Sequence, residues 1–315
     1  MSRVHDALRR AAQGGGQQPP NDNGPTPSSS ARMVAATAAT TTTDITPNLE
    51  HMLENIPEYK WHSSPDSLLM DPTRPMDAPT EEFRTLRTRL NHMQSLQPIH
   101  TLVVTSASPA EGKSFTAMNL ALAEAQLAGN RTLIADFDFR RPVLHTLLNI
   151  DRGPGITDYL MGKVPLEAII KRVANTNLYI MPAGGAVINP LELLNLKEVK
   201  TLIDTLPQLF NWVILDTPPL LFAADANLLS TLTHGTILVV RIGATTIDTV
   251  TRAMQSLCQY NVVGIVVNGA RRGELYSKYT YYHSYYMPKD ESTSDESTDV
   301  AEVEEAEHAE TNTKG

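Results

Sequence analysis

The segment 102–127 constrains the fold of this chain most, because it joins a β-rich run to a helical pattern through a short loop of distinctive composition. The loop reads Ala107-Ser108-Pro109-Ala110-Glu111-Gly112-Lys113-Ser114. Backbone N–H groups in such a loop, with the positive end of the helix that follows, bind phosphate groups. A lysine in this place reaches the β and γ oxygens of a nucleoside triphosphate, and the next hydroxyl ligates Mg²⁺. The segment predicts a P-loop with Lys113 on the phosphates and Ser114 on the metal.

We expect the nucleotide to contact the loop, the first residue of the helix after it, and the end of a later strand. The predicted contacts are Ser108, Pro109, Ala110, Glu111, Gly112, Lys113, Ser114, Phe115 and Asn268. Ala107 stands where the general P-loop pattern has its first glycine, so the close turn there must form with a Cβ present.

Two further predicted strands carry carboxylates. Leu133 to Arg140 contains Asp136 and Asp138, which point to the same side of a strand because they are two residues apart. Trp212 to Asp216 is a near-continuous apolar run, as buried parallel strands are, and ends in one carboxylate. Ligands of open α/β sheets bind beyond the carboxyl ends of the strands, and Mg²⁺ on a nucleotide takes one or two carboxylates plus waters. All three carboxylates can therefore sit at the carboxyl edge of the sheet beside the P-loop; the family resemblance given below implies that Asp138 and Asp216, through water, hold the metal together with Ser114.

A second interpretation of the same residues stays open. Asp136 and Asp138 could cap the next segment or pair with Arg140 and Arg141, since structural ion pairs also cluster carboxylates.

The elements along the chain alternate as they do in a doubly wound, mostly parallel sheet flanked by helices. The strands are expected at 177–181, 236–241 and 262–268, and the helices at 191–206 and 246–258. Asn268 and Arg241, at two strand ends, either touch the adenine and line the crevice or only close a turn. Cys258 is expected in the core and has no second cysteine with which to form an internal disulfide.

Six tyrosines gather just after the last apolar run. They are Tyr276, Tyr279, Tyr281, Tyr282, Tyr285 and Tyr286. Their spacing follows neither the helix nor the strand period, so no single buried face collects them, and we expect exposed hydroxyls that serve as substrates. A sticky aromatic tail or a strand that pairs elsewhere is the alternative.

Composition divides the chain into five parts. We expect a short helix at 1–12, a disordered linker at 13–79, one P-loop domain at 80–275, the tyrosine cluster at 276–286 and an acidic disordered tail at 287–315. From residue 290 to 315 there are ten Asp or Glu and one Lys, which gives −9, so the remainder of the −9 chain sums to zero. A nucleic-acid-binding body would usually be basic, so nucleic acid is not an expected partner.

These motifs resemble the bacterial tyrosine kinases of the capsule and exopolysaccharide machinery, over about residues 78–286. The loop 107–114 resembles the family's Walker A, 133–140 its Walker A′, 213–216 its Walker B, and the tyrosine cluster its autophosphorylated tail. The resemblance implies ATP and Mg²⁺ as cofactors. The catalytic residues that it implies are Lys113, Asp136, Asp138, Arg140 and Asp216, with Asp136 accepting or orienting the phenol proton. A carboxylate of pKa about 4 is a poor base for a phenol of about 10, so positioning and charge neutralisation should dominate.

The resemblance also implies an oligomer, with a ring as the expected form. Glu81, Arg84 and Arg87 match the fixed positions of the family's oligomerisation pattern. A ring gives this pattern a geometric purpose, because the tail of one subunit then reaches the nucleotide site of its neighbour. From the residues alone, the three charges stand three apart on one helical face and could form an exposed intrahelical ladder.

Two departures from the family pattern bear on activity. Ala110 stands where a glycine is common, which would strain the loop if a positive φ is required there. Phe137 stands between the Walker A′ aspartates where the residue is usually small, and could crowd the crevice. Neither removes a charged group, so we expect activity to survive.

Other functions on the same scaffold remain alternatives. A MinD/ParA-type regulatory ATPase would normally carry an additional lysine early in its loop, where this chain has Ser108. A non-catalytic nucleotide-binding assembly factor would keep the loop and phosphorylate nothing. A metal-cluster carrier would need paired cysteines, and Cys258 stands alone.

Partners and location are expected from the family. No secretory h-region follows Met1, and no apolar run approaches the roughly 18 residues that cross a bilayer, so we expect a cytoplasmic protein. Kinases of this family are activated by the cytoplasmic segment of a membrane-anchored polysaccharide co-polymerase. The resemblance therefore implies a separate partner of this kind, recruitment to the inner face of the membrane, and a phosphotyrosine phosphatase that reverses the reaction.

Overall fold

The structure is a computed structural model that describes residues 51–61, 69–70, 79–257 and 262–270. The expected helix 1–12, Cys258, the tyrosine cluster and the acidic tail lie outside these ranges. The chain divides into two compact units, residues 1–55 and 56–315. In the first, residues 51–54 are helical and the Asn55 side chain donates to the His51 carbonyl at 3.0 Å. The second unit holds the fold described below.

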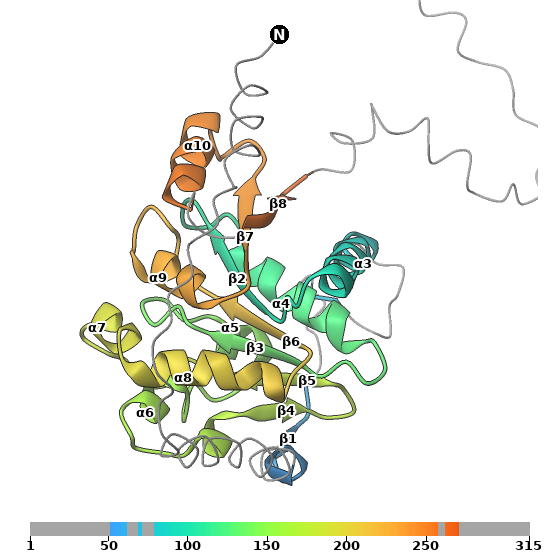
Figure 1. Ribbon diagram of the computed structural model, residues 1–315, viewed down its shortest axis with the longest axis vertical. Coiled ribbons are helices and arrows are strands. Elements are labelled where there is room, and N and C mark those ends of the chain that lie inside the picture. Colours follow the sequence, from blue (N-terminus) through green and yellow to red (C-terminus); the bar gives the residue numbers. More distant parts are fainter. Residues whose placement is uncertain (1–50, 62–68, 71–78, 258–261, 271–315) are drawn as a thin grey trace, which may run out of the picture. The chain divides into compact units, whose positions relative to one another are not determined.

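The described residues of this unit form an eight-stranded sheet in the order β1-β4-β5-β3-β6-β2-β7-β8 (Figure 1). The strands are β1 (Glu58–Tyr59), β2 (Thr101–Ser106), β3 (Thr132–Asp136), β4 (Lys171–Val173), β5 (Leu178–Met181), β6 (Trp212–Asp216), β7 (Gly235–Arg241) and β8 (Val262–Asn268). The strands β5, β3, β6, β2, β7 and β8 pair in parallel. Strand β4 is antiparallel to β5 and parallel to β1, so the edge strand β1 and its neighbour β4 run opposite to the other six strands. The expected doubly wound, mostly parallel sheet is confirmed.

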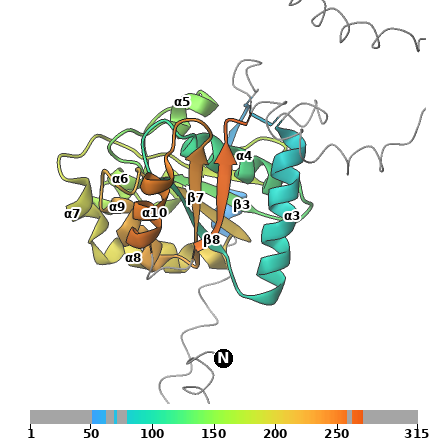
Figure 2. The same cartoon turned by 90° about the horizontal axis from the view of Figure 1, so that it is seen from above.

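Helices connect the parallel strands, as parallel pairing requires. They are α3 (Thr80–Leu96), α4 (Lys113–Ala125), α5 (Leu144–Leu148), α6 (Ile156–Leu160), α7 (Pro190–Leu194), α8 (Lys197–Thr205), α9 (Asp225–Leu232) and α10 (Ile247–Ser256), with 3₁₀ turns η2 (Leu166–Ile169) and η3 (Leu206–Gln208). Figures 1 and 2 show α3 and α4 together on one side of the sheet and α7 to α10 on the other.

The central strands are buried on both faces, and their middle positions are apolar. Every residue of β2, β3 and β6 is buried. Helix α4 packs its alanines and leucines into a core shared with α3 and the central strands, whereas Leu220, Ala226 and Leu238 form a second core with α10. Helix α8 is amphipathic, since its buried residues recur at helical spacing at Val199, Leu202 and Ile203.

The strand ends agree with the sequence where the apolar run is long. Strand β8 has the expected bounds, and β6 ends at Asp216 as predicted. Strand β3 ends at Asp136, so Asp138 lies beyond the strand that was expected to contain it. Helix α4 ends at Ala125, before Leu127.

The range 13–79, expected to be a linker, contains ordered structure near its end. Strand β1 pairs with β4, and Met70 is buried with its N–H donating to Asn119 Oδ1 at 2.7 Å. The domain therefore begins earlier than residue 80. No helix among the described residues combines the length and apolar composition that crossing a bilayer takes.

Candidate active site

The phosphate-binding loop has the backbone that a nest of N–H groups needs. Helix α4 begins at Lys113, and its N-cap residue, Gly112, has φ +93°. A Cβ at Gly112 would lie 1.9 Å from Asn268 Nδ2, so both conformation and space require glycine. Ala110 also has a positive φ, of 64°. The left-handed conformation expected to matter at this position is present, and it costs an alanine about 1–2 kcal/mol.

Side chains from later strands hold the loop in place. The Glu111 carboxylate is buried, accepts the Ser108 N–H at 2.9 Å and bonds the Thr245 hydroxyl. Arg241 Nη1 donates to the Ala110 carbonyl at 3.1 Å, and Asn268 Nδ2 donates to the Glu111 carbonyl at 2.9 Å. Of the two interpretations given to Arg241 and Asn268, these contacts match the one in which they close a turn of the loop. Glu111 and Thr245 are 134 residues apart, and no local pattern marks their pairing.

Lys113 meets carboxylates from two separate strands. Its Nζ lies 2.9 Å from Asp138 Oδ2 and 3.6 Å from Asp216 Oδ1, and it donates to Ser114 Oγ at 3.1 Å. Although burial alone would lower the pKa of Lys113, the charges of Asp216 and Asp138 raise it above its ordinary value. The lysine is therefore held in its charged form, as phosphate binding requires.

The Asp216 carboxylate suits a bound cation best. It is fully buried, and neither of its oxygens has a hydrogen-bond partner among the residues that the structure describes. Burial raises the pKa of Asp216 to about 6, although the charge of Lys113 opposes this shift. A buried carboxylate that has Lys113 Nζ at 3.6 Å but no hydrogen bond of normal length, next to the Ser114 hydroxyl and the Asp138 carboxylate, fits a hard cation such as Mg²⁺.

The protein supplies only part of such a metal shell. Within the described part of the chain, no three His, Cys, Asp or Glu side chains are placed to hold a metal ion by themselves. Mg²⁺ commonly binds through one or two carboxylates plus waters and substrate phosphates. Ser114, Asp138 and Asp216 suit that partial role.

The Asp136 carboxylate is occupied by backbone N–H groups, whereas a residue that receives a proton from substrate would face the substrate. It is fully buried, and its oxygens accept the backbone N–H groups of Asp138 at 3.2 Å and of Val143 and Leu144 at 3.1 Å each. Burial and the neighbouring Asp216 raise the pKa of Asp136 well above its ordinary value. These contacts match the second interpretation given above, in which Asp136 caps the segment that follows it.

Phe137 and Arg140, on the same loop, point elsewhere. The Phe137 ring is fully buried and packs against Phe139, with 5.7 Å between the ring centroids. Arg140 binds neither Asp136 nor Asp138: its Nε and Nη2 donate to the two oxygens of Asp225 at 2.9 and 3.1 Å. Asp225, the first residue of α9, was not predicted, because it lies 85 residues away and reads locally as an ordinary acidic start of a helix.

The oligomerisation pattern on α3 makes contacts within the chain. Arg84 pairs with Glu81, three residues earlier, as an intrahelical ladder would. Arg87 is half-buried and donates to the Ala123 carbonyl at 2.9 Å, near the end of α4. A contact of these residues with a second subunit stays a prediction.

Several known proteins are similar to this chain in sequence. No family model matches the chain. The tyrosine-protein kinase YwqD of Bacillus subtilis is 34% identical over 212 residues, which cover 67% of this chain and 89% of YwqD. The tyrosine-protein kinase wzc of Salmonella typhimurium is 30% identical over 74% of this chain but only 34% of its own length. The chain thus spans most of YwqD and about a third of wzc.

Solved structures agree in fold. The chimerical protein CapA2B2 superposes with a TM-score of 0.61 and 30% identity, over 70% of this chain and 97% of that one. The kinase domain of the Escherichia coli tyrosine kinase ETK has the same TM-score of 0.61 with 28% identity, over 72% and 95%. Sequence relatives, fold and motifs agree, and the chain belongs to the family of bacterial tyrosine-protein kinases of capsule and exopolysaccharide synthesis.

Proposed function

We propose that this chain transfers the γ-phosphoryl group of ATP to tyrosine hydroxyls, chiefly those of the cluster Tyr276–Tyr286 on the tail of a neighbouring subunit. The observation that supports this most is the meeting of Lys113 with Asp138 and Asp216, which follow or end two different strands. A lysine and carboxylates at the carboxyl edge of a sheet are what phosphoryl transfer needs for positioning and charge neutralisation.

Each residue has a separate task in the proposed reaction. Lys113 and the loop N–H groups would hold the β and γ phosphates, while Ser114, Asp138 and Asp216 would hold Mg²⁺. Bound there, Mg²⁺ would neutralise charge on the triphosphate. The phenol oxygen forms a bond to the γ phosphorus, and the bond from that phosphorus to the oxygen of the leaving ADP breaks. The phenol proton passes to solvent.

Asp136 is a positioning residue in this scheme. It holds the N–H of Asp138 and the first turn of α5, so it fixes the carboxylate that contacts Lys113. We prefer this role to the predicted one, in which Asp136 accepts or orients the phenol proton, because its oxygens already accept three backbone N–H groups. Base strength is secondary, and catalysis comes from orientation and charge.

A single incubation tests the activity. Purified full-length protein with Mg²⁺-ATP should acquire phosphotyrosine, Lys113→Met should abolish it, and Lys200→Met should not, because Lys200 is an exposed lysine of α8. ATP hydrolysis without phosphotyrosine, with or without the cytoplasmic segment of a membrane partner, would contradict the proposal and favour a MinD/ParA-type ATPase. Nucleotide binding with neither reaction would favour a non-catalytic assembly factor.

Mixing two variants tests transfer between subunits. Strand β8 ends two strands away from β2, so the length of the tether permits a tail to reach its own site as well as a neighbour's. We mix Lys113→Met, which keeps its tail, with a variant whose six tail tyrosines are phenylalanine. Phosphotyrosine on the Lys113→Met chain supports transfer between subunits, and its absence there contradicts it.

Regulation is proposed to follow from charge. Each phosphotyrosine adds about −1.5 to −2 charges next to an already acidic tail, which favours its release from a site rich in carboxylates. We propose that the protein alternates between an unphosphorylated ring and phosphorylated, dissociated subunits. A membrane-anchored co-polymerase would activate the kinase, and a phosphatase would restore the unphosphorylated state. We propose that this cycle regulates export of a polysaccharide at the inner face of the membrane. Native mass spectrometry that finds the same oligomer before and after full phosphorylation would contradict the cycle.

A further inference from the structure

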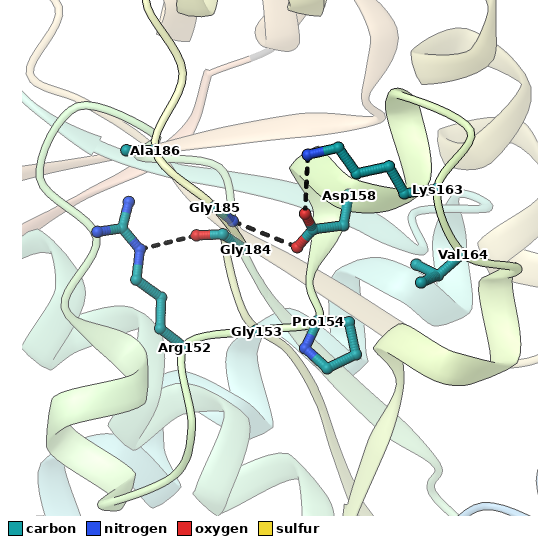
Figure 3. A pocket seen from close by; sticks show the side chains of 9 residues that line it. All are labelled: Arg152, Gly153, Pro154, Asp158, Lys163, Val164, Gly184, Gly185 and Ala186. Atoms are coloured by element: carbon teal, nitrogen blue, oxygen red, sulfur yellow. Dashed lines mark hydrogen bonds and ion pairs between the residues drawn. The ribbon is translucent and has the colours of Figure 1, made fainter.

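An open surface pocket of about 410 Å³ lies outside the P-loop, between the segment 152–164 and the segment 184–186 (Figure 3). We call it the glycine pocket, because Gly153, Gly184 and Gly185 form much of its lining. Its volume falls in the range of small-molecule sites, roughly 300–1,000 Å³. In Figure 3, Arg152 and Lys163 stand on opposite sides of it.

The two cations are held in different ways. Arg152 Nε donates to the Gly184 carbonyl at 2.7 Å, which fixes the side chain, and the terminal guanidinium nitrogens make no hydrogen bond or ion pair with other described residues. Lys163 Nζ lies 3.6 Å from Asp158 Oδ1 and its side chain is 57% exposed. With Asp158 included, the pocket carries two positive charges and one negative charge.

Backbone contacts make the pocket rigid. Asp158 Oδ2 accepts the N–H groups of Gly155 at 3.1 Å and Gly185 at 3.3 Å. A Cβ at Gly155 would lie 2.3 Å from Gly184 N, and one at Gly184 would lie 2.5 Å from Thr157 Oγ1. The two segments therefore pack closer than side chains allow, and the pocket is formed before any ligand arrives.

The pocket is lined by segments that follow two strands of the same sheet in the chain. Strand β3 precedes the first segment and β5 precedes the second, and these strands are parallel neighbours. Strand β5 is three strands away from β2, which leads into the P-loop. At about 4.8 Å per strand, β5 and β2 are offset by roughly 14 Å, which we take as the offset of the loops that follow them.

The lining fits an apolar ring that carries a phosphate. Pro154, Val164 and the glycine backbone form apolar and flat walls, while Arg152 and Lys163 supply cations at the rim. Guanidinium groups bind phosphate oxygens bidentately, and ammonium groups bind them as point charges. A phosphorylated tyrosine combines these two features.

The spacing of the tail tyrosines matches the offset. An extended chain covers at most about 3.3–3.6 Å per residue, so roughly 14 Å corresponds to four or five residues. Pairs of the cluster lie four apart, at Tyr281 and Tyr285 and at Tyr282 and Tyr286, and five apart at Tyr276 and Tyr281. One tyrosine of a tail can thus lie in the pocket while another lies at Lys113.

We propose that the glycine pocket binds a phosphotyrosine of a tail that is already partly phosphorylated, carried by a second copy of this chain, and thereby presents the next tyrosine of that tail to the active site. This inference rests on the proposed kinase activity. It assigns a docking function to Arg152 and Lys163, which take no part in the transfer itself. Phosphorylation of a tail would then accelerate after its first phosphate.

Intact-mass spectrometry over time separates the first phosphate from the later ones. In Lys163→Gln and Arg152→Gln, we expect an unchanged rate for the first phosphate and a rate for later phosphates that falls about tenfold or more, as expected for the loss of one charge-assisted hydrogen bond. Singly phosphorylated chains should accumulate. Lys200→Gln, an exposed lysine of α8, is the matched control and should behave as the unaltered protein.

The outcomes distinguish the two proposals. If the unaltered protein makes no phosphotyrosine, the kinase proposal fails; if it does and Lys163→Gln shows the same distribution of phosphates, the pocket proposal alone fails. Lys163 is exposed and makes one ion pair, so Lys163→Gln keeps the test decisive if Arg152→Gln does not fold.

Direct binding provides a second measurement. The full chain with six tail phenylalanines is titrated calorimetrically with a peptide of residues 274–289, phosphorylated at Tyr285 or not. The phosphopeptide should bind at least about tenfold tighter, and Lys163→Gln should remove that advantage. Equal affinities of the phosphorylated and unphosphorylated peptides would show that the pocket recognises the ring or the tail carboxylates. A tighter binding of the phosphopeptide that survives Lys163→Gln would place the phosphate elsewhere. Either result overturns the proposal.

Discussion

Replacing Glu124 by glutamine removes a buried carboxylate from the helix that begins with the P-loop lysine. Glu124 is 1% exposed, and its Oε2 accepts the side-chain N–H groups of Asn91 and Asn130 at 2.9 Å each. Burial raises its pKa from 4.5 to about 7, although the two hydrogen bonds and the charge of Arg87 oppose the shift. The folded protein therefore binds a proton at this site more tightly than the unfolded chain.

The sign of the effect follows from this difference. Below pH 4.5 the carboxyl is protonated in both states and costs nothing, whereas above pH 7 the folded state must hold a buried charge. Stability is thus lost as pH rises through this window. The destabilisation amounts to about 1 kcal/mol at pH 5 and about 3 kcal/mol at pH 8.

Glu124→Gln should therefore gain about 2 kcal/mol of unfolding free energy, relative to the unaltered protein, between pH 5 and pH 8. Urea unfolding can be followed by tryptophan fluorescence, because Trp212 Nε1 donates to Asn91 Oδ1 in the same network. Glu198→Gln, on the exposed side of α8, is the control and should show no such gain. The same difference between Glu124→Gln and the unaltered protein at both pH values would refute the reasoning.

Three further substitutions test the site. Ala110→Gly should raise the unfolding free energy by about 1 kcal/mol, because glycine accepts the φ of 64° without strain; urea unfolding measures it, and a loss of stability would contradict the strain. Arg140→Gln leaves the buried Asp225 carboxylate without its cation and should lower the unfolding free energy by about 3 kcal/mol. The double variant Arg140→Gln with Asp225→Asn should recover most of this loss, and additive losses in this double-mutant cycle would argue against the pair. Gly112→Ala should lower phosphotyrosine formation about 100-fold, since its Cβ collides with a side-chain amide, whereas Gly129→Ala, also at positive φ but in open space, should keep activity.

The parts that could be predicted from the sequence are those whose signal is local. The P-loop, the strand that ends at Asp216 and the strand Val262–Asn268 each show their pattern within ten residues. The edge strands β1 and β4 span two and three residues, too few for a period to appear. Their pairing depends on residues more than a hundred positions apart.

The site divides in the same way. Lys113, Asp138 and Asp216 were predicted to converge from their motifs, and they do. The sequence assigned Asp136 a role at the substrate hydroxyl and did not predict its contacts with the backbone of α5, because which carboxylate accepts that backbone depends on how the loop turns after β3. The partner of Arg140 was missed for a similar reason, since nothing near Arg140 points to α9.

Strand β8 ends at Asn268, and the side-chain amide of this residue donates a hydrogen bond to the Glu111 carbonyl of the phosphate-binding loop. A peptide joined after Ala270 therefore starts two residues beyond a side chain that contacts the phosphate-binding loop. The catalytic body can thus serve as a cassette onto which foreign tyrosine sequences are grafted, and a library of such grafts would report which sequences the enzyme accepts.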